Sequence, residues 1–156
     1  MRLLLTGHEG YIGAVMAPQL EAAGHEVVGL DSGLFAQCTF GPEPARIPTI
    51  ARDVRDLRAA DFTGFDAVLH LAGLSNDPLG DLDPDLTYDI NHLASVRMAE
   101  LARQAGVSRY LFSIGMPLER WLYFLAELLQ TEQRPDRFLA EGVGGLARLP
   151  WVSGAR

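Results

Sequence analysis

The sequence predicts an α/β fold built on a doubly wound parallel sheet, and three observations support this. Short apolar runs alternate with amphipathic stretches over the first 113 residues, as they do in chains of alternating strands and helices. Apolar residues make up 48% of the chain, which is enough for a packed core. The 156 residues fit one domain. Because crossovers between parallel strands are right-handed, the expected strand order is 3-2-1-4-5.

Five strands and two helices are predicted over these residues. The strands are Leu3–Thr6, Glu26–Leu30, Ile47–Ala51, Ala67–Leu71 and Tyr110–Ser113. The first helix, Tyr11–Ala23, ends at Gly24, and the second, Asp85–Ala105, has apolar residues at helical spacing and ends at Gly106. Residues 32–46 are predicted to be a loop. Pro48 places the third strand at an edge of the sheet, because proline cannot donate a ladder hydrogen bond.

The chain changes character after the fifth predicted strand. Pro117–Gln130 is predicted to be a helix with one broad apolar face, and its proline suits a first helical turn. Phe138–Arg156 mixes glycine and proline with apolar residues and receives no assignment. We therefore expect a first unit over residues 1–115 and a divergent helical extension over residues 116–156, packed on the same domain.

Composition excludes several classes of function. The net charge is −7 and the basic residues form no cluster, which argues against nucleic acid as a partner. The one cysteine, Cys38, excludes an internal disulfide. No apolar run approaches the roughly 20 residues that a membrane span needs, so we expect a cytoplasmic protein without a membrane segment. Asp81, Asp83 and Asp85 are interpreted as helix-start charges, not as metal ligands.

A glycine-rich turn joins the first strand to the first helix. Its sequence is Thr6-Gly7-His8-Glu9-Gly10-Tyr11-Ile12-Gly13, a G-x-x-G-x-x-G spacing. The first glycine permits the tight turn, the second lets the backbone approach a pyrophosphate, and the third lets the helix pack close to the sheet. The helix N-terminus then offers free N–H groups to the phosphates. This arrangement predicts a Rossmann-like dinucleotide site, in which contact between His8 and the pyrophosphate is one alternative and a structural histidine the other.

Asp31 follows the second strand, 24 positions after Gly7. A carboxylate there can accept hydrogen bonds from both ribose hydroxyls and would repel a 2′-phosphate. The sequence therefore predicts NAD rather than NADP as the cofactor.

Five segments together resemble one protein family. They are the glycine turn, Gly29-Leu30-Asp31-Ser32, Arg52-Asp53-Val54-Arg55-Asp56, His70-Leu71-Ala72-Gly73-Leu74-Ser75-Asn76-Asp77-Pro78 and Tyr88-Asp89-Ile90-Asn91. Residues 1–113 resemble the extended short-chain dehydrogenase/reductase family, in its nucleotide-sugar epimerase/dehydratase branch. The resemblance implies that Asp53 and Val54 lie beside the adenine. It also implies that Leu71, Ala72 and Gly73 line the ribose and nicotinamide side, and that Asn91 lies near the active site.

The resemblance ends where that family carries its catalytic pair. Family members use a Tyr-x-x-x-Lys pair, in which the lysine lowers the pKa of the tyrosine and binds the nicotinamide ribose. These 156 residues contain no lysine, and Gly115 stands where a catalytic serine or threonine is expected. Tyr123 is followed four positions later by Glu127, which would raise a phenol pKa, so we interpret this tyrosine as a packed aromatic residue. We assign no catalytic residue and no metal ligand.

Two classes of function follow from these observations. In the first, the chain is an NAD(H)-binding protein that resembles the epimerases and dehydratases, lacks their acid–base pair and retains a possible nucleotide-sugar ligand. In the second, it is a non-catalytic module that senses NAD or binds a partner. A homodimer through the long helix and Pro117–Gln130 would be one such pairing. We also expect a shortened domain, and the sequence leaves open that it is the remnant of a longer enzyme.

Overall fold

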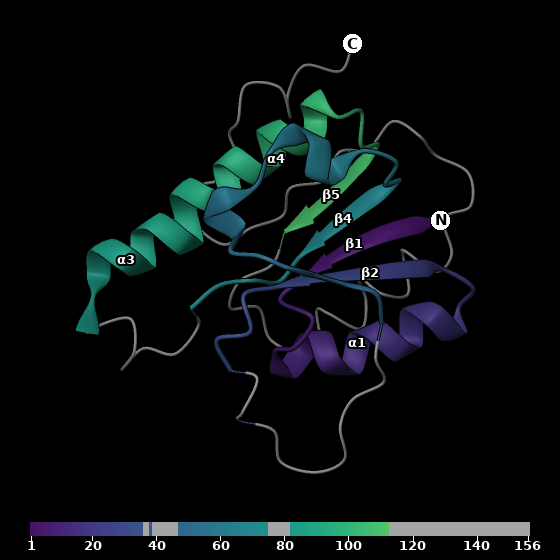
Figure 1. Ribbon diagram of the computed structural model, residues 1–156, viewed down its shortest axis with the longest axis horizontal. Helices are drawn as coiled ribbons and strands as arrows, with labels where there is room; N and C mark the ends of the chain where they lie inside the picture. Colours follow the sequence, from purple (N-terminus) through teal and green to yellow (C-terminus); the bar gives the residue numbers. More distant parts are fainter. Residues whose placement is uncertain (36–37, 39–46, 75–81, 113–156) are drawn as a thin grey trace.

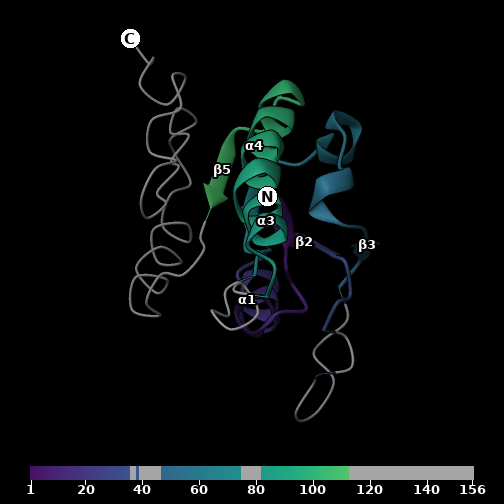
Figure 2. The ribbon, with the colours of Figure 1, turned by 90° about the vertical axis from the view of Figure 1, so that its left-hand side faces the viewer.

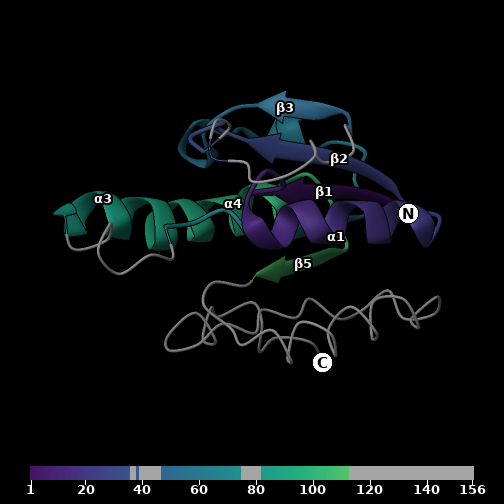
Figure 3. The same ribbon diagram turned by 90° about the horizontal axis from the view of Figure 1, so that it is seen from below.

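The computed structural model describes residues 1–35, 38, 47–74 and 82–112. Its centre is a sheet of five parallel strands, in which β3 and β5 form the two edges (Figures 2 and 3). The strands are β1 (Arg2–Thr6), β2 (Glu26–Asp31), β3 (Thr49–Ala51), β4 (Ala67–His70) and β5 (Arg109–Phe112). Their order is β3-β2-β1-β4-β5, which confirms the Rossmann-like doubly wound sheet and the predicted order.

Helices cover both faces of the sheet (Figure 1). Helix α1 (Tyr11–Ala22) lies on one face and α4 (Ala94–Gln104) on the other, while α3 (Pro84–Tyr88) extends beyond the ends of the strands. The predicted long second helix is one helical stretch with a π-helical segment, Asp89–Leu93, between α3 and α4. Asp83 caps the start of α3, where its carboxylate accepts from the backbone N–H of Leu86 at 2.9 Å.

The third strand is shorter than predicted, because only three residues pair with β2. Pro48 lies just outside it and contributes its carbonyl, which accepts from the N–H of Gly29 at 2.8 Å. Two short 3₁₀ turns that the sequence pattern did not indicate follow this strand, at Val54–Asp56 and Ala59–Phe62. Arg97 of α4 holds the first turn by donating to the Arg55 carbonyl at 2.8 Å.

The core consists of two apolar clusters, one on each face of the sheet. Alternate residues of β1 belong to the two clusters: Leu3 and Leu5 pack on the α1 side, and Leu4 packs on the α4 side. This alternation follows from the period of two along a strand. The α4 side is the larger cluster and takes in Phe62 from the second 3₁₀ turn and Met98 from α4. Because both faces are covered, the functional groups lie at the ends of the strands.

Several predictions lie outside the described residues. They are the helix Pro117–Gln130, the segment Phe138–Arg156, the roles of Gly115 and Tyr123, and the boundary at residue 115. Within the ranges that are described, no helix combines the length and the apolar content that a bilayer crossing requires.

Candidate dinucleotide site

The glycine turn lies at the carboxyl end of β1, where its backbone is packed against neighbouring backbone. Gly7 has φ +70°, and a Cβ added there would lie 2.8 Å from the Ala72 nitrogen. This confirms that the tight turn requires glycine. A Cβ at Gly13 would overlap the Gly7 carbonyl oxygen and lie 2.5 Å from the Cα of His8. Gly13 therefore allows the helix to pack closely against the backbone that follows β1, where the Gly7 N–H still donates to the Leu30 carbonyl of β2 at 2.8 Å.

The N-terminus of α1 is open toward the same edge. Gly10 is its N-cap residue and provides no side chain to cap it. A helix leaves its first N–H groups without an intrahelical partner, and here these belong to Tyr11, Ile12 and Gly13. The Tyr11 side chain is 87% exposed, whereas Ile12 packs against the cluster on the α1 side. Both residues can therefore meet a phosphate through their backbone N–H groups.

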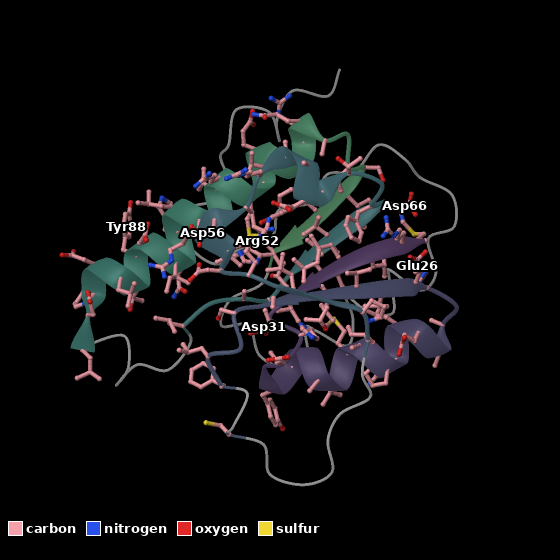
Figure 4. The ribbon with its side chains drawn as sticks, in the orientation of Figure 1. Glu26, Asp31, Arg52, Asp56, Asp66 and Tyr88 are labelled. Carbon is pink, nitrogen blue, oxygen red and sulfur yellow. The ribbon has the colours of Figure 1, made fainter. Side chains whose placement is uncertain are left out.

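Asp31 lies at the carboxyl end of β2, facing the start of α1 (Figure 4). Its Oδ2 atom accepts from the N–H of Glu9 at 3.1 Å, and its Oδ1 atom accepts from the N–H of Gly33 at 3.0 Å. A carboxylate offers about four acceptor positions, so about two remain for ribose hydroxyls. The structure thus joins the predicted acid to the predicted glycine turn, which lie far apart in the sequence.

The His8 imidazole is buried beneath the turn. It lies against Gly29 of β2, where an added Cβ would come within 2.5 Å of the ring. Its Nε2 atom is 3.0 Å from the hydroxyl of Thr49, which itself donates to the Ile47 carbonyl. The proton of the His8–Thr49 hydrogen bond therefore comes from Nε2. The alternatives for His8 were contact with the pyrophosphate and a structural role. The buried ring favours the structural role, so that only the His8 backbone could face a phosphate.

The segment after β4 runs beside the glycine turn. The N–H groups of Leu71 and Ala72 each lie 3.2 Å from the hydroxyl oxygen of Thr6. Further along, the Asn91 side chain accepts from the Leu74 N–H at 2.8 Å and donates to the Leu74 carbonyl at 2.7 Å. Asn91 therefore acts on this segment through the backbone of Leu74. Residues 71–74, which include the predicted Leu71, Ala72 and Gly73, are held at both ends.

Asp53 follows β3 and pairs with Arg55. Its Oδ1 atom accepts from the backbone N–H and the Nε of Arg55 at 2.9 and 3.0 Å, and its Oδ2 atom accepts from Nη2 at 2.8 Å. These bonds hold the pKa of Asp53 below its ordinary value and raise the pKa of Arg55. Val54 is buried in the cluster on the α4 side. The placement of Asp53 and Val54 beside an adenine stays a prediction.

The sequence pattern missed two residues that shape this edge, Thr6 and Ser95. Thr6, His70 and Ser95 are all buried, and His70 lies 2.7 Å from the Thr6 hydroxyl and 2.8 Å from the Ser95 hydroxyl. Burial lowers the pKa of His70 to about 3, so the ring is neutral. A threonine that ends an apolar strand directly before a glycine was the available signal. Ser95 gave none, because serine is common on exposed helix faces.

The arrangement defines a class of protein. A parallel sheet of this order binds ligands at the carboxyl ends of its strands, where the strand order reverses. That place falls between β1 and β4, and the glycine turn and residues 71–74 meet there. Fold and site together are those of a Rossmann-like dinucleotide-binding domain.

Comparison with known proteins gives the family. The sequence model of the NAD dependent epimerase/dehydratase family matches residues 3–114. The chain therefore belongs to the NAD-dependent epimerase/dehydratase family.

Its relatives include nucleotide-sugar enzymes. A UDP-glucose 4-epimerase of Mycolicibacterium smegmatis is 34% identical over 118 residues, which cover 70% of this chain and 37% of the relative. A UDP-glucose 4-epimerase of Klebsiella pneumoniae is 32% identical over 122 residues, which cover 72% of this chain and 88% of the relative. The chain thus spans little more than a third of the first of these relatives.

Solved structures show the same fold. An NAD-dependent NDP-hexosamine 5,6-dehydratase of tunicamycin biosynthesis superposes with a TM-score of 0.63 at 28% identity, covering 71% of this chain and 36% of that one. The UDP-glucose 4-epimerase of Thermus thermophilus, solved in complex with NAD, gives a TM-score of 0.57 at 28% identity, covering 72% and 37%.

Proposed function

We propose that this chain binds NAD(H) at the carboxyl edge of its sheet. The observation that carries the proposal is the junction of the glycine turn with Asp31, where unpaired helix N–H groups and a carboxylate face the same side. The fit is supported by the three turn glycines, because side chains at Gly7 and Gly13 would collide with backbone and one at Gly10 would lie 3.2 Å from the Gly7 oxygen. The turn therefore presents backbone to a ligand.

Each part of the cofactor has a candidate partner. The N–H groups at the start of α1 would hold the pyrophosphate, and Asp31 would accept hydrogen bonds from the adenosine ribose. Asp53 and Val54 would lie on the adenine side, and residues 71–74, positioned by Asn91, on the nicotinamide side. When bound, NAD supplies a hydride acceptor at its nicotinamide ring. The described residues would bind and orient it.

We propose further that these 156 residues do not turn over a nucleotide sugar. The chain contains no lysine, so the tyrosine–lysine pair that the resemblance implies cannot form within it. Named relatives act on UDP-glucose, and a nucleotide sugar is the corresponding candidate ligand here. Turnover of UDP-glucose by a purified preparation would contradict this part of the proposal.

The test of NAD binding is calorimetric titration of NAD⁺ and NADP⁺ into the purified chain. Wild type should bind NAD⁺ more tightly than NADP⁺. Asp31→Asn removes the charge and should weaken NAD⁺ binding by about tenfold to a hundredfold, as loss of a charged hydrogen bond does. It should also reduce the difference in affinity between NAD⁺ and NADP⁺. Glu26→Gln, at the opposite end of the same strand, is the matched control and should leave both affinities unchanged. Absence of NAD⁺ binding by wild type at millimolar cofactor would refute the proposal.

A second candidate function, self-association, is favoured by the helical segment that includes α3. Figure 1 shows α3 extending beyond the ends of the strands, and Figure 4 labels Tyr88 on it. Four large apolar side chains are exposed along this stretch: Leu82, Leu86, Tyr88 and Leu93. A patch formed by such side chains would be typical of a protein interface.

Sedimentation equilibrium over a range of concentrations tests the pairing. Wild type should dimerise, and the double substitution Tyr88→Glu and Leu93→Glu should weaken dimerisation by at least about tenfold, since it places charge on the apolar surface. Val15→Glu, at an exposed apolar position on α1, is the control. A wild-type chain that stays monomeric at high concentration would exclude this function.

A further inference from the structure

Three buried side chains connect the sheet to the helix across the α4 side. Thr6 ends β1 and His70 ends β4, and the two residues are register partners in neighbouring strands. Ser95 lies in the first turn of α4. The His70 ring lies 2.7 Å from the Thr6 hydroxyl through Nδ1 and 2.8 Å from the Ser95 hydroxyl through Nε2. We call these residues the Thr6–His70–Ser95 network.

Hydrogen-bond accounting fixes the direction of every bond in this network. The Ser95 hydroxyl donates its single proton to the Asn91 carbonyl at 2.9 Å, so it can only accept from His70. His70 must therefore carry its proton on Nε2, which leaves Nδ1 as an acceptor. The Thr6 hydroxyl consequently donates to Nδ1. Its two lone pairs are then free to accept from the N–H groups of Leu71 and Ala72, both at 3.2 Å. The Leu71 N–H is shared with the Thr6 carbonyl oxygen, also at 3.2 Å, whereas the Ala72 N–H donates to the hydroxyl.

At its Ser95 end, the network is also connected to residues 71–74. Asn91, whose carbonyl accepts from Ser95, holds Leu74 through its side chain. The π-helical segment that contains Asn91 displaces the regular helical ladder at this point. Residues 71–74 are thus held at one end by Thr6 and at the other by Asn91, and His70 and Ser95 join the two holding points.

Packing keeps this network away from water. The His70 ring lies 5.0 Å from the Phe112 ring and 6.1 Å from the Tyr110 ring of β5. Thr6 and His70 are fully buried, and Ser95 is 2% exposed. Buried polar groups are costly unless they are all satisfied, so loss of one member disturbs the others.

We propose that the Thr6–His70–Ser95 network is a positioning device for the cofactor, because it sets the distance between residues 71–74 and the glycine turn. The link is short: Ala72, which Thr6 holds, is also the residue whose backbone lies against Gly7. This inference rests on the proposed NAD(H) site and deepens it. His70 and Thr6 act through the backbone and touch no substrate, so they are positioning residues.

The imidazole proton gives a direct test that does not depend on the cofactor. Long-range ¹H–¹⁵N correlation spectra of the full chain should show His70 protonated on Nε2 and unprotonated on Nδ1. In Thr6→Val the Nδ1 atom loses its donor, so its ¹⁵N resonance should shift while Nε2 stays protonated. A His70 ring protonated on Nδ1 would overturn the proposal.

Cofactor titrations test the positioning role. Thr6→Val, which keeps the shape but removes the hydroxyl, should weaken NAD⁺ binding roughly tenfold, as expected for a lost buried hydrogen bond. Thr6→Ser keeps the hydroxyl and should restore binding to within about twofold of wild type. Val68→Ala, in β4 and in the same apolar cluster, is the matched control: it should lower the melting temperature and leave the affinity unchanged.

The possible failures are distinguishable. Equal NAD⁺ affinities of wild type and Thr6→Val would overturn the positioning role alone. An equal loss in Thr6→Val and Val68→Ala would also overturn it, because the effect would then follow stability. No NAD⁺ binding by wild type would overturn the proposed function and the positioning role together, whatever the imidazole spectra show.

Discussion

The two ends of the sheet use their polar groups in opposite ways. At the amino end the charged groups pair with each other: Arg2 donates to Glu26 at 2.9 Å, and its backbone N–H donates to Asp66 at 2.7 Å. Figure 4 shows Glu26 and Asp66 close together at that end, with Asp31 away from them. At the carboxyl end, the helix N–H groups and part of the Asp31 carboxylate keep their hydrogen-bonding capacity for a ligand.

The polar groups at the two ends of the sheet therefore contribute differently to the stability of the fold and to the binding of a ligand. A paired, solvent-exposed ion adds little free energy, commonly below about 1 kcal/mol, and offers nothing to a ligand. An open helix N-terminus beside a carboxylate keeps N–H donors and carboxylate acceptor positions available, and these are complementary to a dinucleotide. We therefore expect substitutions at the carboxyl end to change binding or the turn, and substitutions at the amino end to have small effects on stability alone.

The largest effect is expected at Gly13. Gly13→Ala places a methyl group against the Gly7 carbonyl and the His8 backbone, so the turn must shift. Forced overpacking of this kind costs about 3 kcal/mol of the free energy of unfolding and should abolish NAD⁺ binding. Urea unfolding and calorimetric titration measure the two effects. Val15→Ala, on the exposed side of the same helix, is the control, and equal behaviour of the two variants would contradict the proposed packing of the turn.

A pH-dependent effect of intermediate size is expected from His70. Its pKa is lowered from 6.5 to about 3 by burial, so below pH 6.5 the unfolded chain binds a proton that the folded chain does not. The free energy of unfolding therefore falls with decreasing pH in the window from 6.5 to 3, by up to about 1.4 kcal/mol per pH unit. Above pH 6.5 the contribution is complete.

Comparison of wild type with His70→Phe isolates the contribution of His70. The carboxylates titrate in both proteins, so their contribution cancels in the difference. The difference between their unfolding free energies should slope with pH below 6.5 and be flat above it. Should the variant fail to fold, an NMR titration of folded wild type provides the same information, since the His70 ring should stay neutral at pH 5. A His70 ring that titrates near 6.5 in the folded chain would contradict the prediction. The neighbouring groups Thr6, Ser95 and Tyr110 carry no charge in this range.

The smallest effect is expected at the amino end of the sheet. Glu26→Gln removes the exposed ion pair with Arg2 and should lower the free energy of unfolding by at most about 0.5 kcal/mol, less at high salt. Chemical unfolding at low and high ionic strength measures this. A loss of several kcal/mol that persists at high salt would show that Glu26 contributes more than an exposed ion pair. It would contradict the expectation that substitutions at the amino end have only small effects on stability.

Much of the site could be predicted from local sequence. The glycine turn and Asp31 were identified from the spacing of three glycines after an apolar strand and from an acid at the end of the next strand. The structure explains the first glycine, because Gly7 has φ +70°. The side-chain direction of His8 could not be predicted, since it depends on the space that Gly29 leaves in the neighbouring strand. The 3₁₀ turn after β3, where Asp53 pairs with Arg55, also escaped prediction because such short turns have no hydrophobic period.

The strand order, the glycine turn and the acid of the proposed NAD site could be predicted from local sequence, because they depend on hydrophobic periodicity, on the conformational freedom of glycine and on which residue type ends a strand. Tertiary structure decided that Thr6, His70 and Ser95 form one network, and that Asn91 acts through Leu74. The physical reason is that a hydrogen bond between side chains 64 and 25 positions apart depends on strand register and helix placement. Both of these are properties of the packed sheet and not of any segment alone.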